Sequence, residues 1–135
     1  MPDGDPPRLE GVRLRWHFGY WDGPINGVAT YDGRDYWFDA EPFDWEDEPP
    51  HSRRYFLYEL TDKELAEERY WHERFRDLVG THTEYDEEGQ RLSGEVRPPS
   101  GAFDREYAQR KRPDYMSRPP TGWFAIPGYV SSRRD

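Results

Sequence analysis

Apolar and polar residues alternate along the first third of the chain with a period of two, the pattern of half-buried β-strands. The apolar residues of the first strand, predicted over 12–20, are Val12, Leu14, Trp16, Phe18 and Tyr20. Further strands are predicted over 25–31 and 35–40, separated by the pair Asp32-Gly33, which is a strong hairpin signal. Because strands with short connections usually pair with their neighbours, the pattern predicts an antiparallel meander.

A fourth strand is predicted over 54–60, and it is apolar on both faces, which favours a position inside the sheet. A helix is predicted over 62–79 directly after it. Thr61 and Glu64 have the spacing of a capping box at its start, and Gly80 stands where a glycine commonly ends a helix.

One face of the predicted helix is apolar and is expected to pack on the sheet. Its residues are Leu65, Trp71, Phe75, Leu78 and Val79. Arg69, Glu73 and Arg74 lie on the opposite side of the helical wheel and are expected to face solvent. The wheel therefore predicts that Trp71, Phe75 and Leu78 are buried against the sheet.

The rest of the chain contains weaker signals, namely a short helix over 103–112 and a last short strand over 123–126. The predicted fold class is α+β, with an antiparallel sheet of four or more strands and one main helix packed on one face. The sheet is a meander, either strongly curved or an open barrel. We predict a flexible N-terminal arm over 1–8, a single α+β domain over 9–130 and a C-terminal tail over 131–135.

Composition is consistent with a folded domain despite a hydrophobic fraction of only 33%, because aromatic residues alone make up 17% of the chain and each ring buries a large area. The 135 residues include no cysteine, which excludes disulfides and thiolate chemistry and favours the cytoplasm. No apolar run is long enough to span a bilayer, so we expect a soluble protein. The net charge of −9 disfavours contact with nucleic acids and anionic membranes.

The first candidate for chemistry is the pair Glu68 and His72, one helical turn apart on the apolar face. Two ionisable side chains on a core-facing stripe are costly unless they are paired, so we expect them to touch each other. As weak catalytic candidates they would lie in a pocket between sheet and helix, lined also by Trp16 and Trp71, with His72 as acid, base or ligand. The structural alternative is a pair at the edge of the stripe with no chemical role, and it is favoured.

No cofactor or metal is predicted. The chain contains no glycine-rich phosphate loop and no nucleophile elbow. Glu68 and His72 alone would supply only two ligands, whereas a zinc site needs three or four.

The second candidate is an acidic loop predicted over 39–50, which contains two aromatic residues and is bounded by prolines. Its six carboxylates come from Asp39, Glu41, Asp44, Glu46, Asp47 and Glu48. The residues predicted to bind a partner are Phe43, Asp44, Trp45 and Glu46. Aromatic side chains act as buried anchors in protein contacts, and charges set encounter rate and specificity. The alternative is a merely solvated surface, and the role of the basic stretch over 105–118 is left open.

The function that the sequence favours is an accessory or regulatory protein acting through protein–protein contacts, an acidic binding protein of the inhibitor or immunity type. Its partner would be a protein with a basic surface, and an enzymatic role is disfavoured. The alternative is a small enzyme or a ligand-binding domain that uses Glu68 and His72. A pocket that reaches these two residues would favour the alternative, whereas a filled core would favour the partner-binding function.

Overall fold

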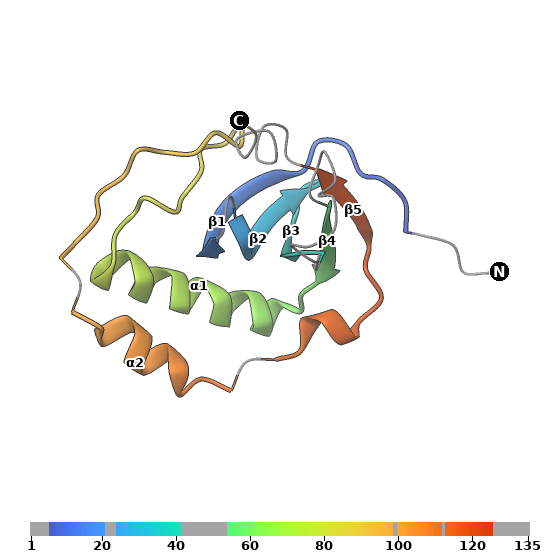
Figure 1. The fold of residues 1–135 in the computed structure, drawn as a ribbon. Helices are drawn as coiled ribbons and strands as arrows, with labels where there is room; N and C mark the ends of the chain where they lie inside the picture. The colour runs from blue at the N-terminus through green and yellow to red at the C-terminus, as the bar shows by residue number, and fades with distance from the viewer. Residues whose placement is uncertain (1–5, 21–23, 42–53, 99, 112, 126–135) are drawn as a thin grey trace, which may run out of the picture.

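The computed structural model describes residues 6–20, 24–41, 54–98, 100–111 and 113–125 (Figure 1). The described residues form strands β1 (Arg13–Tyr20), β2 (Pro24–Tyr31), β3 (Arg34–Ala40), β4 (Arg54–Glu59) and β5 (Gly122–Ala125), helices α1 (Asp62–Leu78) and α2 (Ala102–Ala108), and a 3-10 turn (Tyr115–Ser117). In this part of the chain, no helix has the length and apolar character needed to cross a bilayer.

The five strands form one antiparallel sheet in the order β1-β2-β3-β4-β5, a meander that does not close into a barrel. The predicted fold class is confirmed, and β4 has the predicted place inside the sheet. Asp32 and Gly33 both have positive φ, 52° and 81°, and Tyr31 pairs directly with Arg34 across the turn. This is the conformation that a tight hairpin loop requires and that an Asp-Gly pair readily adopts.

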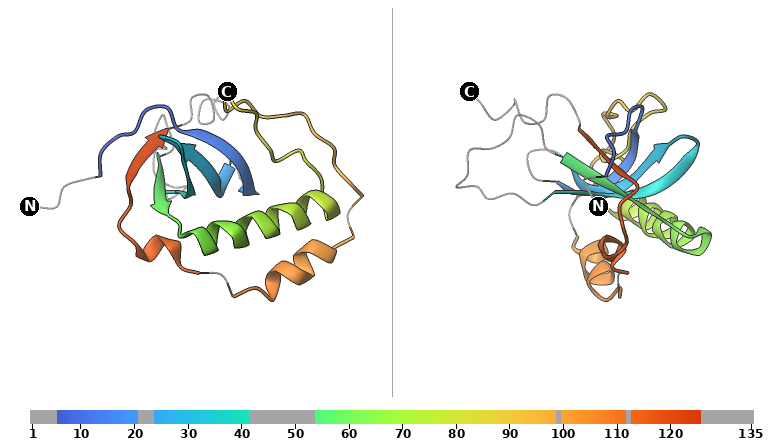
Figure 2. Two further views of the ribbon diagram at one scale, coloured as in Figure 1. Left: turned by 180° about the vertical axis from the view of Figure 1, so that it is seen from behind. Right: turned by 90° about the vertical axis from the view of Figure 1, so that its right-hand side faces the viewer.

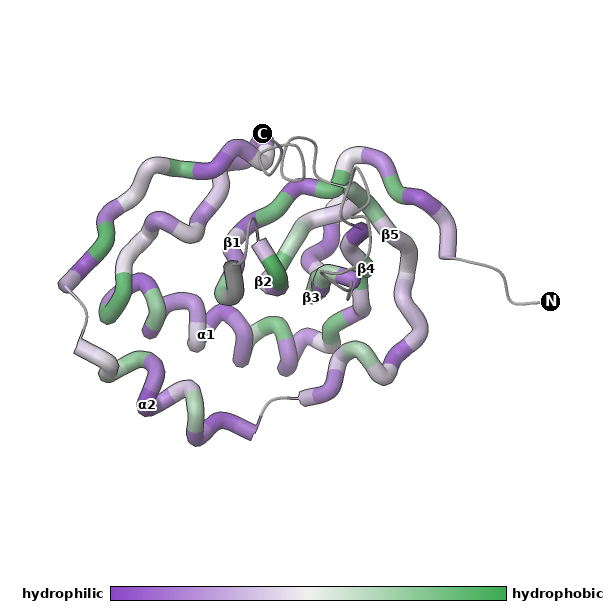
Figure 3. The backbone as a smooth tube through the Cα atoms, in the orientation of Figure 1, coloured by the Kyte–Doolittle hydropathy of each residue, from purple (hydrophilic) through white to green (hydrophobic). Residues whose placement is uncertain are grey.

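One face of the sheet carries an apolar cluster that includes residues of all five strands. It consists of Leu9, Leu14, Ala29, Tyr36, Phe38, Tyr55, Leu57, Tyr85 and Phe124. A second cluster lies on the helix side and consists of Trp16, Val28, Trp37, Tyr58, Leu60 and Tyr115. Figure 3 shows that hydrophobic residues are frequent along the strands, whereas α1 alternates between hydrophobic and hydrophilic positions.

Irregularities in β1 change the faces that its residues occupy. The register with β2 shifts between Leu14 and Trp16 and again between His17 and Gly19. A shift of one residue moves a side chain to the other face of a sheet. His17, which the alternation places beside Arg13 and Arg15, is therefore only 1% exposed. The simple period of two was wrong at this residue.

Both outer edges of the sheet are paired with irregular segments. Along β5, the N–H of Leu9 donates to Trp123 O at 2.8 Å, and the N–H of Trp123 donates to Pro7 O at 2.9 Å. Along β1, the N–H of Tyr85 donates to Arg15 O at 3.0 Å. These hydrogen bonds satisfy backbone N–H and C=O groups at the sheet edges that would otherwise be unpaired. The division into an arm, a domain and a tail stays a prediction, but the described end of the predicted arm includes backbone paired with β5.

Helix α1 begins at the predicted capping box. Glu64 N–H donates to Thr61 Oγ1 at 3.1 Å, and Thr61 N–H donates to Glu64 Oε1 at 2.9 Å. Phe75 is buried as predicted, and Arg69 and Glu73 are exposed as predicted.

Two residues of the apolar face differ from the prediction. Trp71 is only half-buried and packs edge-on against Phe103 and Tyr107 of α2. Leu78 is also half-buried. Arg74, expected in solvent, is half-buried and paired with Glu106 at 2.5 Å. The physical reason is that α2 covers part of α1, which a wheel of one helix cannot reveal.

Helix α2 is shorter than the predicted 103–112, and both helices lie on one side of the sheet (Figure 2). Phe103 and Tyr107 of α2 stack against Phe18 of β1, with ring centroids 6.5 Å and 5.7 Å apart. Phe103 also meets Phe75 edge-on at 5.0 Å. Aromatic rings from β1, α1 and α2 thus form one shared cluster.

Candidate functional site

Strand register brings aromatic and charged side chains into one row across the end of the sheet. Phe56 of β4 pairs with Trp123 of β5, and Trp123 pairs with Arg8 of the N-terminal segment. Directly opposite residues share a face, and so do residues two apart on one strand, which adds Arg54 to the same face. We call these residues, together with Glu41, the Trp123 surface: Arg8, Glu41, Arg54, Phe56 and Trp123.

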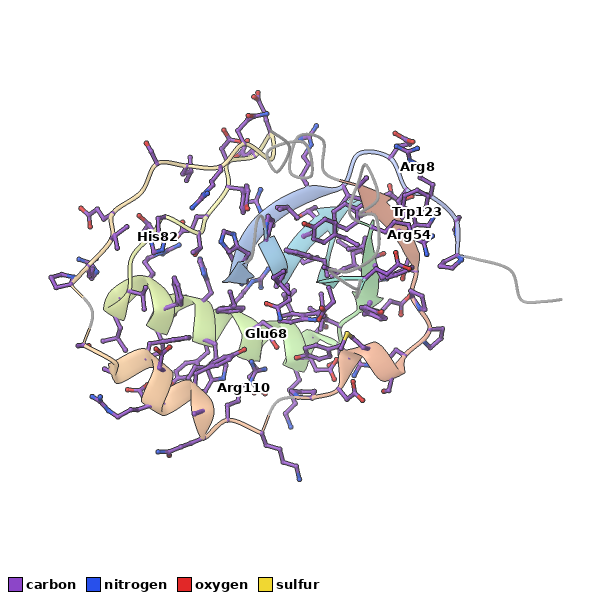
Figure 4. All side chains as sticks on the ribbon, viewed as in Figure 1. Arg8, Arg54, Glu68, His82, Arg110 and Trp123 are labelled. Carbon is purple, nitrogen blue, oxygen red and sulfur yellow. The ribbon has the colours of Figure 1, made fainter. Side chains whose placement is uncertain are left out.

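Two guanidinium groups lie over the indole of Trp123. The Cζ atoms of Arg8 and Arg54 are 5.3 Å and 5.2 Å from its ring centroid, and Arg54 is also 5.2 Å from the ring of Phe56. These distances are in the range of cation–π contacts. The labelled side chains in Figure 4 show Arg8, Trp123 and Arg54 gathered at the end of β4 and β5 that is remote from α1.

A bidentate ion pair with Glu41 fixes the position of the Arg54 side chain within this surface. Its Nε and one terminal nitrogen donate to the two carboxylate oxygens of Glu41 at 2.9 Å and 2.8 Å. The hydrogen bonds from Arg54 lower the pKa of Glu41, against an opposing effect of burial. The backbone N–H of Glu41 also donates to Arg54 O at 2.8 Å, so a backbone bond and a side-chain ion pair join the same two residues.

The predicted partner-binding residues Phe43, Asp44, Trp45 and Glu46 lie outside the described residues. The first acid of the predicted loop is described, and its place differs from the prediction. Asp39 belongs to β3, is only 8% exposed, and accepts a hydrogen bond from Trp37 Nε1 at 3.2 Å. It is therefore part of the folded sheet rather than of an exposed acidic loop.

Glu68 and His72 are both buried, as the wheel predicts, but they do not pair with each other. Glu68 is 0% exposed and binds the guanidinium of Arg110, with the closest contact at 2.6 Å. Tyr115 donates its hydroxyl to the same carboxylate at 2.5 Å. Figure 4 shows Glu68 and Arg110 pointing toward each other between α1 and α2.

Arg110 completes this network. Its Nε is 3.0 Å from a carboxylate oxygen of Glu67, and it donates to the hydroxyl of Tyr107 at 3.2 Å. Burial alone would lower the pKa of Arg110, but the hydrogen bonds and charge of Glu68 raise it overall. A buried, satisfied network of this kind fixes the packing of the C-terminal half of the chain on α1.

His72 has different partners. Its ring stacks on Trp16 with centroids 4.2 Å apart and an angle of 8° between the planes. Its Nε2 is 3.4 Å from a carboxylate oxygen of Glu84, which also accepts from Arg76 at 2.8 Å. The pKa of His72 is lowered to about 4, mainly by burial; the charge of Glu84 opposes this lowering, and the charge of Arg76 adds to it.

Three cavities of the described residues have defined linings, and none of the three is lined by Trp16, Glu68, Trp71 or His72, the residues of the predicted pocket. These cavities are lined by other parts of the chain, at β1 and β5, at the end of α1, and beside His82. In the described part of the chain, no cluster of three or more His, Asp or Glu residues could hold a metal ion.

The alternation in β1 gave no sign that His17 is buried. Its Nδ1 lies 3.0 Å from the hydroxyl of Tyr85. Burial, together with the smaller effects of the charges of Arg91 and His82, lowers the pKa of His17 to about 4. His17 is therefore a neutral core residue at pH 7.

Comparisons with known proteins identify no relative that could suggest a function for these residues. No protein-family model matches the chain, and no curated protein or solved structure shows significant similarity to it.

Proposed function

We propose that this protein is an acidic accessory or regulatory protein that binds another protein, with the Trp123 surface as its contact. The observation that carries the proposal is the half-buried indole of Trp123 between the guanidinium groups of Arg8 and Arg54. Trp and Arg dominate the energetics of protein interfaces, and Phe is enriched in them.

Order within the surface also supports binding. Arg54 is held by both oxygens of Glu41, and stacking restrains its guanidinium between Phe56 and Trp123. Side chains that are fixed before binding lose less conformational entropy when a partner docks. The surface is therefore preorganised for a protein contact.

Charge indicates the kind of partner. The net charge of −9 attracts a protein with a basic surface and opposes a nucleic acid. The two cations of the Trp123 surface are balanced by Glu10, 3.7 Å from Arg8, and by Glu41. Four more acids, Asp44, Glu46, Asp47 and Glu48, belong in sequence to segment 42–53, and the residues on either side of that segment, Glu41 and Arg54, are hydrogen-bonded to each other. A contact in the cytoplasm suits a chain without cysteine.

An enzyme or ligand-binding domain built on Glu68 and His72 is less well supported. The carboxylate of Glu68 is occupied by Arg110 and Tyr115, and the ring of His72 is covered by Trp16. Neither residue lines the cavity at β1 and β5, the one at the end of α1 or the one beside His82. These contacts favour a structural role for both side chains.

The test is a capture experiment with matched variants. Wild-type protein, Trp123→Ala and Tyr70→Ala are immobilised and exposed to extract of the source organism, and retained proteins are purified and titrated. Tyr70 is the control because it is an aromatic residue of α1 that is 52% exposed. We expect Trp123→Ala to weaken binding of the purified partner thirtyfold or more, as for a hot-spot loss of about 2 kcal/mol, with Tyr70→Ala unchanged.

Urea unfolding of each variant shows whether a loss of binding reflects a loss of fold. Binding should weaken as salt rises, because complementary charges contribute to it. Unchanged affinity in a folded Trp123→Ala protein would refute the Trp123 surface as the contact. Trp45→Ala tests the segment predicted from sequence, and we expect weaker capture with nearly unchanged thermal stability.

A further inference from the structure

A cavity of about 430 Å³ opens where the sheet does not close. One side is formed by the start of β1 and the end of β5, and the other by segment 85–91. Figures 1 and 2 show the chain after α1 passing over the β1 side of the sheet. The volume is within the range of small-molecule sites, about 300–1,000 Å³.

The cavity follows from the way the two sheet edges are paired. The N-terminal segment pairs with β5 at Leu9 and then turns at Gly11, where φ is +80°, before β1 begins. On the opposite edge of the sheet, the backbone of Tyr85 pairs with Arg15 of β1, and a turn over residues 86–90 follows. The start of β1 and the end of β5 therefore face each other without a ladder between them.

The outer wall of the cavity is a tight, internally bonded turn. Asp86 Oδ1 accepts from the N–H groups of Glu88 and Gln90, both at 2.9 Å, and Gly89 has a φ of +85°. One terminal nitrogen of Arg13 donates to Glu87 O at 2.9 Å and so fastens the turn to β1. The cavity is thus preformed.

The lining has an apolar wall and a charged rim. Leu14, Phe124 and Tyr85 are 5%, 3% and 6% exposed and belong to the apolar cluster that includes all five strands. The rim carries Arg13 and Arg91. Arg91 is oriented by a bond of 3.2 Å from its Nε to His82 O. Among the lining residues that the structure describes, Glu88 is the one acid, so this part of the lining is net positive in a protein whose overall charge is −9.

We propose that this cavity binds a small organic anion, a carboxylate with an aromatic or branched aliphatic tail. The carboxylate lies against the guanidinium groups of Arg13 and Arg91, and the tail packs on Leu14 and Phe124. Arginine pairs well with carboxylate geometry, and a small number of polar groups beside an apolar wall is the usual form of a ligand site. This site is separate from the Trp123 surface.

The probe is 3-phenylpropionate, titrated into ¹⁵N-labelled full-length protein and followed by amide NMR shifts. We expect saturable shifts at 12–14, 85–91 and 124–125, with a millimolar or lower Kd. The neutral amide of the same acid should bind at least tenfold more weakly, because it lacks the charge. Arg91→Met should weaken binding at least tenfold and Arg91→Lys less, whereas Arg105→Met on α2, outside the lining, should leave the Kd unchanged.

Arg91→Met tests the site without removing core packing, because the side chain of Arg91 is exposed. Arg13→Met is a second variant with the same expected direction. The proposal is overturned by shifts that do not saturate below 10 mM of probe, or by saturable shifts confined to other residues. Equal binding of the acid and its amide, or equal binding by Arg91→Met and wild type, would overturn it as well.

Discussion

Acid should destabilise this protein between pH 7 and pH 5 through two buried histidines. His17 is 1% exposed and His72 is 5% exposed, and burial is the main reason that the pKa of each falls to about 4. In the unfolded chain each imidazole has a pKa of about 6.5. The folded pKa is thus lower than the unfolded pKa, so the neutral form is the one that folding favours.

The direction in which stability changes with pH follows from this difference between the folded and unfolded pKa values. Above pH 6.5 both states bind few protons at these residues, and the full stability is present. As pH falls toward 4, the unfolded chain takes up protons that the folded protein excludes, and stability is lost. At pH 5 unfolding should take up nearly two protons at the two imidazoles, and each histidine should cost about 2 kcal/mol relative to pH 7.

The assay is urea unfolding followed by tryptophan fluorescence at pH 7, 6 and 5, at constant ionic strength. Wild type should lose about 4 kcal/mol between pH 7 and 5, which is a large part of the stability of a typical domain. His17→Gln and His72→Gln should each show about half of that dependence, and the double variant should show little. Paired carboxylates such as Glu64, whose pKa is lowered to about 2, lose their contribution mainly below pH 4.5, outside this window.

A wild-type loss below about 1 kcal/mol would refute the reasoning. So would a folded double variant that keeps the full pH dependence, because the protons would then bind elsewhere. The two single variants separate the sites, since His17 contacts Tyr85 and His72 stacks on Trp16.

Three further changes test the packing, all by urea unfolding. Glu68→Gln should cost about 3–5 kcal/mol, because it leaves the guanidinium of Arg110 buried without its carboxylate; a loss below 1 kcal/mol would show that water reaches the pair. Trp71→Ala should cost about 1–3 kcal/mol, less than for a fully buried ring, since Trp71 is half-buried under α2. Gly80→Ala should cost more than about 1 kcal/mol, because its Cβ would lie 2.0 Å from Glu95 O; an unchanged midpoint would contradict that crowding.

Local signals predicted most of the fold because its elements are adjacent in sequence. The Asp32-Gly33 turn fixed the β2–β3 pairing, and the capping box at Thr61 fixed the start of α1. Both depend on residues within four positions of each other, where turn and cap chemistry acts. The shifts within β1 have no such local signature, and they put His17 in the core.

The partners of Glu68 and the residues of the Trp123 surface were harder to predict, because the residues that meet there are distant in sequence. The cost of burying Glu68 indicated that it needs a partner, and His72 was the nearest local choice. Its actual partners, Arg110 and Tyr115, are separated from it by 42 and 47 positions. The Trp123 surface joins Arg8 to β5, a pairing that no sequence period reports.

Glu68 and His72 are buried in contact with Arg110, Tyr115 and Trp16, whereas the two proposed binding sites are formed by other residues. Trp123 and Phe124 are successive residues of β5, so their side chains point to opposite faces of the sheet. Trp123 is the centre of the proposed protein contact, and Phe124 lines the cavity beside β1. Because Arg91 lines the cavity and is not part of the Trp123 surface, Arg91→Met should leave partner affinity unchanged, and Trp123→Ala should leave binding of the carboxylate probe unchanged. The two proposals can therefore fail separately, and a variant that abolishes both activities would report a loss of the shared strand rather than of either site.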